Sequence, residues 1–309
     1  MTRVDRAFRY WAAAAGVIIM TVATACGQQS GEMQPEVQPE KLSSVVSRVI
    51  KASPDRESSS YAPPTPAVAQ AIAAGVSELM NTGRASLESY DQVPVELPNT
   101  GQGDERSDSV VALVERGHPT AGNGLYIVRR APMSQLVVQI PHPVADRYSE
   151  YMGTQLFAQS GARLFMMAGA HRNAGDDSAD VAHRSDSTFA AVNDAVVQKG
   201  MTVVQIHGFS SDNHDDFGDV VLSNSVAEPS PTLRRLASDL EDGGFDTCTY
   251  DGKKCKALAA TANVQAVAAR ARGAEFIHIE VNQKVRKDRS ERRQLMRTIA
   301  ASLRASGVG

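Results

Sequence analysis

The stretch LVVQIPHPVADRYSEYMGTQLFAQSGARLFMMA, residues 136–168, decides the fold. Its first five residues, Leu136–Ile140, form an apolar run bounded by turn signals, which predicts a buried strand. Pro143 opens a predicted helix that Gly161 ends, and the run RLFMMA, residues 163–168, predicts the next strand. A strand, a helix and a second buried strand in this order are typical of a parallel βαβ unit.

The same alternation continues to the end of the chain. Continuous apolar strands that alternate with helices predict a mainly parallel sheet with helices on both faces. The sequence therefore predicts an α/β fold, a three-layer sandwich. A strand pair is expected to precede this region, at 109–114 and 124–128. Further helices are expected at 188–199, 231–242, 263–272 and the C-terminus, and further strands at 202–206, 245–250 and 276–281.

The first thirty residues, MTRVDRAFRYWAAAAGVIIMTVATACGQQS, have the layout of a secretory signal, with early arginines followed by an apolar run. The end of the run, Ala23-Thr24-Ala25-Cys26, resembles the lipobox of bacterial lipoproteins. The apolar run is shorter than the ~20 residues that a membrane-spanning helix needs. A transmembrane anchor and an ordinary cleaved signal remain the alternatives.

This reading divides the chain into a signal peptide at 1–25, a flexible tether at 26–63 and a single domain at 64–309. The tether is expected because 27–63 is rich in Gln, Pro, Glu and Ser. Cys26 would carry the acyl chains, such as palmitate, that anchor the protein in membrane lipid. The expected location is extracytoplasmic, on the bacterial cell envelope.

Cys248 and Cys255 enclose the short loop CTYDGKKC, and a disulfide bond between them suits an oxidising compartment. Two free thiols or half of a zinc site are the alternatives. The net charge of −3 and the lack of a basic stripe with interleaved aromatic residues argue against a nucleic-acid partner.

Three predicted central strands end in side chains suited to metal binding. His142 and Asp146 follow the first, His207 follows the strand TVVQI, and Glu280 lies near the end of FIHIEV. Ligands of open parallel sheets bind beyond the carboxyl ends of the strands, so these side chains can converge. Two imidazoles and a carboxylate leave one position open for water, as in a catalytic zinc site, and another carboxylate can then accept a proton.

Each of these residues also has an ordinary structural explanation. His142 can be a turn residue between two prolines, and Asp146 can be favoured by the dipole of a helix N-terminus. His207 can be a buried histidine bonded to the backbone. Glu280 can be an inward-pointing carboxylate paired with an arginine.

The order His-x-x-x-Asp, then a histidine at a strand end, then a late glutamate, resembles the zinc carboxypeptidase-like fold. The resemblance is greatest to its small amidohydrolase branch, the poly-γ-glutamate hydrolases and N-formylglutamate amidohydrolases, over about residues 124–285. It implies that His142, Asp146 and His207 bind Zn²⁺ and that Glu280 is the general base. The family's first motif is commonly His-x-x-Glu, so Glu150 is an alternative second ligand.

The polar loop at 169–189 follows a strand and should lie at the same edge of the sheet. Arg172 is a candidate for stabilising the oxyanion of a tetrahedral intermediate or for holding a substrate carboxylate. Asp180 and His183 are candidates for supporting the metal ligands, for contacting substrate or for a separate metal site. The alternative is a solvated loop in which Asp186 or Ser187 caps the next helix.

These features together predict a membrane-tethered zinc hydrolase that cleaves an amide or peptide bond in a peptide-like or γ-glutamyl substrate. A non-catalytic, envelope-binding lipoprotein is the main alternative. A serine α/β-hydrolase is less favoured, because no Gly-x-Ser-x-Gly motif follows His207.

Overall fold

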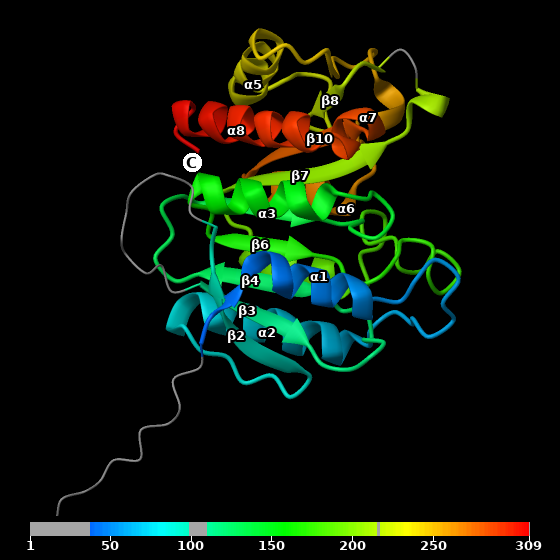
Figure 1. Ribbon diagram of the computed structural model, residues 1–309, viewed down its shortest axis with the longest axis vertical. Coiled ribbons are helices and arrows are strands. Elements are labelled where there is room, and N and C mark those ends of the chain that lie inside the picture. Colours follow the sequence, from blue (N-terminus) through cyan, green and yellow to red (C-terminus); the bar gives the residue numbers. More distant parts are fainter. Residues whose placement is uncertain (1–37, 99–109, 215–216, 309) are drawn as a thin grey trace, which may run out of the picture. The chain divides into compact units, whose positions relative to one another are not determined.

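A mixed β-sheet forms the centre of the computed structural model, which describes residues 38–98, 110–214 and 217–308. Within these residues ten strands follow the order β1-β2-β3-β4-β6-β5-β7-β10-β8-β9 (Figure 1). Their bounds are β1 Glu40–Lys41, β2 Tyr90–Glu96, β3 Val110–Glu115, β4 Leu125–Arg129, β5 Leu136–Ile140, β6 Leu164–Met167, β7 Thr202–Phe209, β8 Val220–Ser223, β9 Thr247–Thr249 and β10 Glu275–Asn282.

Helices cover both faces of this sheet, which confirms the predicted α/β sandwich of three layers (Figure 1). One apolar core contains side chains of α1, α3, α5 and α8, and a second core contains side chains of α2, α4 and α6. The helices are α1 Leu42–Ala52, α2 Pro66–Thr82, α3 Ser149–Ser160, α4 Thr188–Val196, α5 Pro231–Asp242, α6 Val264–Ala271, α7 Gln283–Lys287 and α8 Arg289–Ala305.

The four central strands, β6, β5, β7 and β10, are parallel to one another. Their side chains are buried almost throughout because helices cover both faces, and this explains the continuous apolar runs in the sequence. Towards the two edges of the sheet, β4 pairs with β6 and β8 pairs with β10 in antiparallel fashion. The carboxyl ends of the central strands therefore meet at one edge.

The prediction of a flexible tether at 26–63 is wrong for the part that the structure describes, which begins at residue 38. Helix α1 places Leu42, Val45, Val46 and Val49 in the apolar core. These residues follow the spacing of an amphipathic helix, and that periodicity outweighs the polar composition around it. The folded body therefore begins well before residue 64. The expected signal peptide, Cys26 and the tether up to residue 37 lie outside the described residues.

The predicted helix at Pro143 begins later, at Ser149. The intervening residues form turns, in which the Asp146 amide donates to the His142 carbonyl over 2.8 Å. Tyr148 has a left-handed backbone, with φ at 77°, and this conformation separates the turns from the helix. The turns fold the chain back over the end of β5 and bring Asp146 close to His142.

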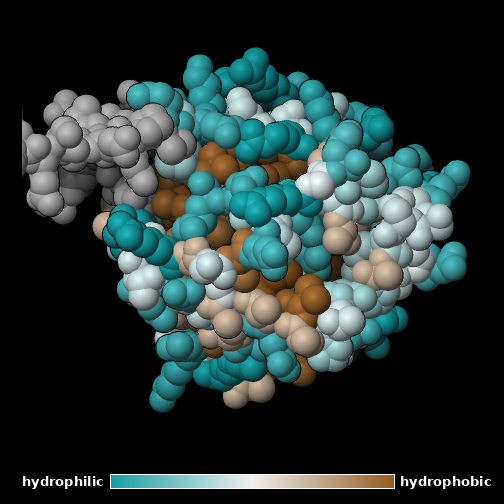
Figure 2. All heavy atoms as spheres, turned by 90° about the horizontal axis from the view of Figure 1, so that it is seen from below, coloured by the Kyte–Doolittle hydropathy of each residue, from teal (hydrophilic) through white to brown (hydrophobic). Residues whose placement is uncertain are grey.

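The molecular surface around β2 is mostly hydrophilic. Seen from the β2 side of the molecule, apolar side chains lie mainly in hollows between polar ones (Figure 2). Pro94 lies within β2 and has no amide hydrogen to offer to a further strand.

Among the described helices, none has the length and apolar character needed to cross a bilayer. The predicted disulfide bond between Cys248 and Cys255 is present and links β9 to the start of a 3₁₀ turn.

Candidate metal centre

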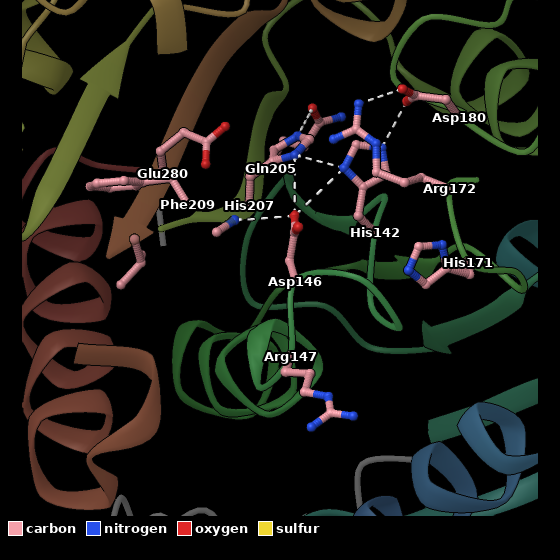
Figure 3. Close-up of polar contacts among 12 residues, drawn as sticks. His142, Asp146, Arg147, His171, Arg172, Asp180, Gln205, His207, Phe209 and Glu280 are labelled. Atoms are coloured by element: carbon pink, nitrogen blue, oxygen red, sulfur yellow. Dashed lines mark hydrogen bonds and ion pairs between the residues drawn. The ribbon is translucent and has the colours of Figure 1, made fainter. Parts of the chain in front are cut away.

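Three buried side chains converge at the carboxyl ends of the parallel strands. His142 lies two residues after β5, Asp146 lies in the turn that follows, and His207 lies in β7. One potential ligand atom from each lies within 4.8 Å of the other two. Figure 3 shows the two imidazole rings and the Asp146 carboxylate pointing toward one another. The sequence therefore predicted this group of side chains correctly as neighbours in space.

The spacing of the donor atoms fits a single small metal ion. The Nδ1 atoms of His142 and His207 are 3.2 Å apart, and Oδ2 of Asp146 lies 3.5 Å from the first and 3.7 Å from the second. Tetrahedral zinc with ligand bonds of about 2.0–2.1 Å separates its ligand atoms by about 3.3 Å. Two imidazole nitrogens and one carboxylate oxygen are also donors that zinc prefers. The residues present therefore fit a zinc ion.

The outer nitrogen of each imidazole has its own acceptor. His142 Nε2 lies 2.9 Å from Oδ1 of Asp180, and His207 Nε2 lies 2.8 Å from Oε1 of Gln205. A hydrogen on each outer nitrogen leaves both Nδ1 atoms free to bind a cation. Partners of this kind are typical of metal-ligating histidines, whose orientation and basicity they set.

The backbone holds the third ligand candidate. The amide of Gly208, the residue after His207, donates to Oδ2 of Asp146 over 3.1 Å. Asp146 is buried, yet hydrogen bonds and charge interactions with the two histidines outweigh burial and hold the pKa of its carboxyl well below the usual range. Asp146 therefore remains ionised at neutral pH.

The two histidines differ in their affinity for protons. Burial lowers the pKa of His207 to about 4, although Asp146 opposes this change. Burial also disfavours charge on His142, but hydrogen bonds with Asp146 and Asp180 outweigh it and raise its pKa. His142 therefore holds a proton more readily than His207 does. A metal ion that binds here has to compete with protons for the imidazole nitrogens.

Asp180 connects the predicted loop to this centre. Besides His142, its carboxylate accepts from Arg172 and lies 3.2 Å from Nδ1 of His183. The hydrogen bonds and charges around it lower the pKa of Asp180, despite partial burial. Arg172 is about one-third exposed and His183 more than half exposed, so both lie at the rim. Within the described ranges one group of three potential ligands forms, and it excludes Asp180 and His183.

Glu280 lies beside His207 and outside the group of three. It is paired in register with His207 across β10 and β7, so both side chains lie on the same face of the sheet. Figure 3 shows Glu280 on one side of His207, with His142 and Arg172 on the other. Its Oε1 is 3.4 Å from Nε2 of His278, while its buried Oε2 has no hydrogen-bond partner.

Glu150, the alternative second ligand, lies in the first turn of α3 and does not belong to the group. Burial raises the pKa of its carboxyl to about 7. Sequence reasoning missed His278, whose ring centroid is 4.7 Å from that of His207. The alternation in FIHIEV was the available signal, because it places His278 and Glu280 on one face of the strand.

No family model matches the sequence, and no curated protein matches it. Among solved structures, the chain is similar to a bacteriophage poly-γ-glutamate hydrolase, with 13% identity, a TM-score of 0.44 and coverage of 62% of this chain and 93% of that one. It is similar to an N-formylglutamate amidohydrolase from Ralstonia eutropha JMP134, with 13% identity, a TM-score of 0.39 and coverage of 60% and 98%. A metallo-carboxypeptidase from Burkholderia cenocepacia gives 15% identity, a TM-score of 0.39 and coverage of 81% and 71%.

The sequence resembles these same groups of proteins. At such identities and TM-scores the similarity is distant, so the chemistry of the site has to be inferred from its own residues.

Proposed function

We propose that the protein is a zinc-dependent hydrolase that cleaves an amide or peptide bond. The observation that carries this proposal is the triangle formed by Nδ1 of His142, Nδ1 of His207 and Oδ2 of Asp146. Three protein ligands leave one position open for water or substrate, which is the pattern of catalytic rather than structural zinc sites.

His142, Asp146 and His207 would hold the ion. When bound there, zinc supplies a Lewis acid that polarises a carbonyl and lowers the pKa of water. Arg172 lies at the rim and pairs with Asp180. In the proposed reaction its guanidinium stabilises developing negative charge or holds a substrate carboxylate.

Glu280 is the proposed general base. Its Oε2 is buried without a partner, so this oxygen is available to accept a proton. Its position opposite His207 in the sheet places it next to the centre without making it a ligand. In the proposed reaction Glu280 takes the proton of the attacking water and delivers it to the leaving amine.

The substrate class and the location are also proposals. The sequence resemblance favours peptide-like or γ-glutamyl substrates, which include cell-wall peptides, γ-linked glutamyl polymers and small acylated amino acids. Acylated Cys26 would anchor the protein in a membrane of the bacterial cell envelope, on the extracytoplasmic side. The disulfide bond between Cys248 and Cys255 supports this location, since such bonds persist in oxidising compartments.

Replacing Glu280 with Gln tests the catalytic part of the proposal. Glu280→Gln keeps the shape of the side chain and removes the proton acceptor. We expect the variant to retain about one zinc per chain and to lose about 10²–10⁴-fold in kcat on an amide substrate that the parent cleaves. Glu275→Gln, at the opposite end of the same strand, is the matched control and should keep the activity.

Zinc content and turnover are measured on the same preparations. Full activity in Glu280→Gln would remove Glu280 from the mechanism. A folded parent that contains no zinc and gains none when it is supplied would contradict the hydrolase proposal and favour a non-catalytic, envelope-binding lipoprotein.

A further inference from the structure

A chain of buried side-chain amides lies beneath His207. Its five members come from β5, α4, β7 and the start of α6, and each is at most 2% exposed: Gln139, Asn193, Gln205, Asn263 and Gln265. Buried amides cost free energy unless hydrogen bonds satisfy them, and an apolar side chain would pack at these positions without that cost. The chain of amides therefore calls for a role beyond packing.

Gln205 lies at the centre of this chain of amides. Its Nε2 donates to Oε1 of Gln139 over 2.9 Å and to Oε1 of Gln265 over 3.3 Å. Its Oε1 accepts from Nδ2 of Asn263 over 2.7 Å and lies 2.8 Å from Nε2 of His207. Every polar atom of the Gln205 amide is thus engaged.

Two backbone groups fix which way the amides point. Gln265 Nε2 donates to the Val181 carbonyl, which can only accept, so Oε1 of Gln265 must face Gln205 and accept its Nε2. The Ala266 amide can only donate, so Asn263 turns Oδ1 toward it and Nδ2 toward Gln205. The hydrogen bonds of Gln205 with Gln265 and with Asn263 independently give its amide the same orientation, with Oε1 facing His207.

An oxygen at this position requires a hydrogen on Nε2 of His207. The neutral ring then carries its lone pair on Nδ1, the atom that faces His142 and Asp146. We propose that Gln205 is a positioning residue that selects the Nε2–H tautomer of His207 and so keeps its Nδ1 free for a metal ion. This inference rests on the proposed function of the centre as a zinc site.

The two histidines are oriented by different means. His142 has the carboxylate of Asp180 as its outer acceptor, whereas His207 has a neutral amide whose direction is set by the backbone of two distant segments. The amide orients the ring without adding a charge to the buried side of the sheet.

The tautomer itself can be observed by nitrogen-15 NMR of the ring in metal-free wild-type protein at neutral pH. We expect the Nε2–H form for His207. A predominant Nδ1–H form, or an equal mixture, would overturn the proposal, and this result needs no variant to fold. It also stays separate from the proposed function, which fails if the wild type binds no zinc.

A pair of variants separates positioning from stability. Gln205→Met removes the acceptor at similar volume, and we expect a mixed tautomer and an affinity for zinc about 10–100-fold weaker. Gln139→Met removes an equally buried member of the chain of amides that does not touch His207, and it should keep the Nε2–H form and near-parental affinity. Equal losses of zinc affinity in the two variants would assign Gln205 a structural role only.

Discussion

The two faces of strands β5 and β7 differ, although side chains that alternate along the same two strands form both faces. On the side of α3 and α8, the strands present Ile140, Val204 and Ile206, all fully buried in one apolar core. On the opposite side they present Gln139 and Gln205. Gln205 is hydrogen-bonded both to Gln139 and to His207. The comparison teaches that one face packs the apolar side chains of these strands against helices, while the other combines apolar packing with buried amides whose cost is offset by hydrogen bonds to one another and to His207.

The largest expected effect is on stability, at the apolar face. Leu156 of α3 is fully buried in this core, so Leu156→Ala should lower the free energy of unfolding by about 2–5 kcal/mol. Tyr151→Ala, at an exposed position of the same helix, is the control and should change it by less than about 0.5 kcal/mol. Denaturant unfolding measures both, and zinc affinity of the folded protein should stay unchanged. A Leu156→Ala variant as stable as the parent would contradict the assignment of packing to this face.

The second prediction concerns a carboxyl buried at the start of α3. Burial raises the pKa of Glu150 from 4.5 to about 7, so the folded state holds its proton more tightly than the unfolded state. The contribution of Glu150 to stability is therefore complete below about pH 4.5 and is lost as pH rises to 7. Glu150→Gln removes this loss and should be more stable than the parent at pH 8 by up to about 3 kcal/mol, with little difference at pH 4.

Thermal or denaturant unfolding across this pH range checks the effect. The control is Glu228→Gln, which replaces an exposed glutamate and should follow the parent at every pH. If the difference between Glu150→Gln and the parent does not grow between pH 4.5 and 7, the carboxyl is not buried as described.

The smallest effect is expected on zinc affinity, at the polar face. Asp180→Asn keeps an oxygen near Nε2 of His142 and removes the charge that favours its N–H. We expect zinc to bind about 10–100-fold more weakly, as measured by competition with a chelator. Asp186→Asn breaks a comparable exposed pair with Arg184 in the same loop and should leave the affinity unchanged. Equal affinities in both variants would mean that Asp180 does not support His142.

The sequence predicted the centre of the fold and the convergence of His142, Asp146 and His207, because both depend on local patterns. Apolar runs of strand length and the turn residues after them place His142 and His207 at the carboxyl ends of parallel strands. The sequence was a poorer guide to the contacts of polar residues that interrupt an apolar run. Gln139 and Gln205 look like single exceptions in the sequence, and their hydrogen bonds to residues about 60 positions away are set by the tertiary fold alone.

Two other errors have different physical origins. Helix α1 lies where the polar composition of 27–63 predicts a tether, although Leu42, Val45, Val46 and Val49 have the spacing of an amphipathic helix in the sequence. The late start of α3 was not visible, because Pro143 suits the first turn of a helix as well as the turn that it forms here. Hydrogen bonds of Asp146 with the His142 carbonyl and the Gly208 amide favour the turn over the helix.

The most direct test of the central claim is anomalous X-ray diffraction at the zinc edge from crystals of the zinc-loaded protein. We expect one peak per chain, bounded by Nδ1 of His142, Nδ1 of His207 and Oδ2 of Asp146. A peak coordinated by other side chains, or by Nε2 of either histidine, would contradict the account, as would a zinc-saturated crystal with no peak among these three residues.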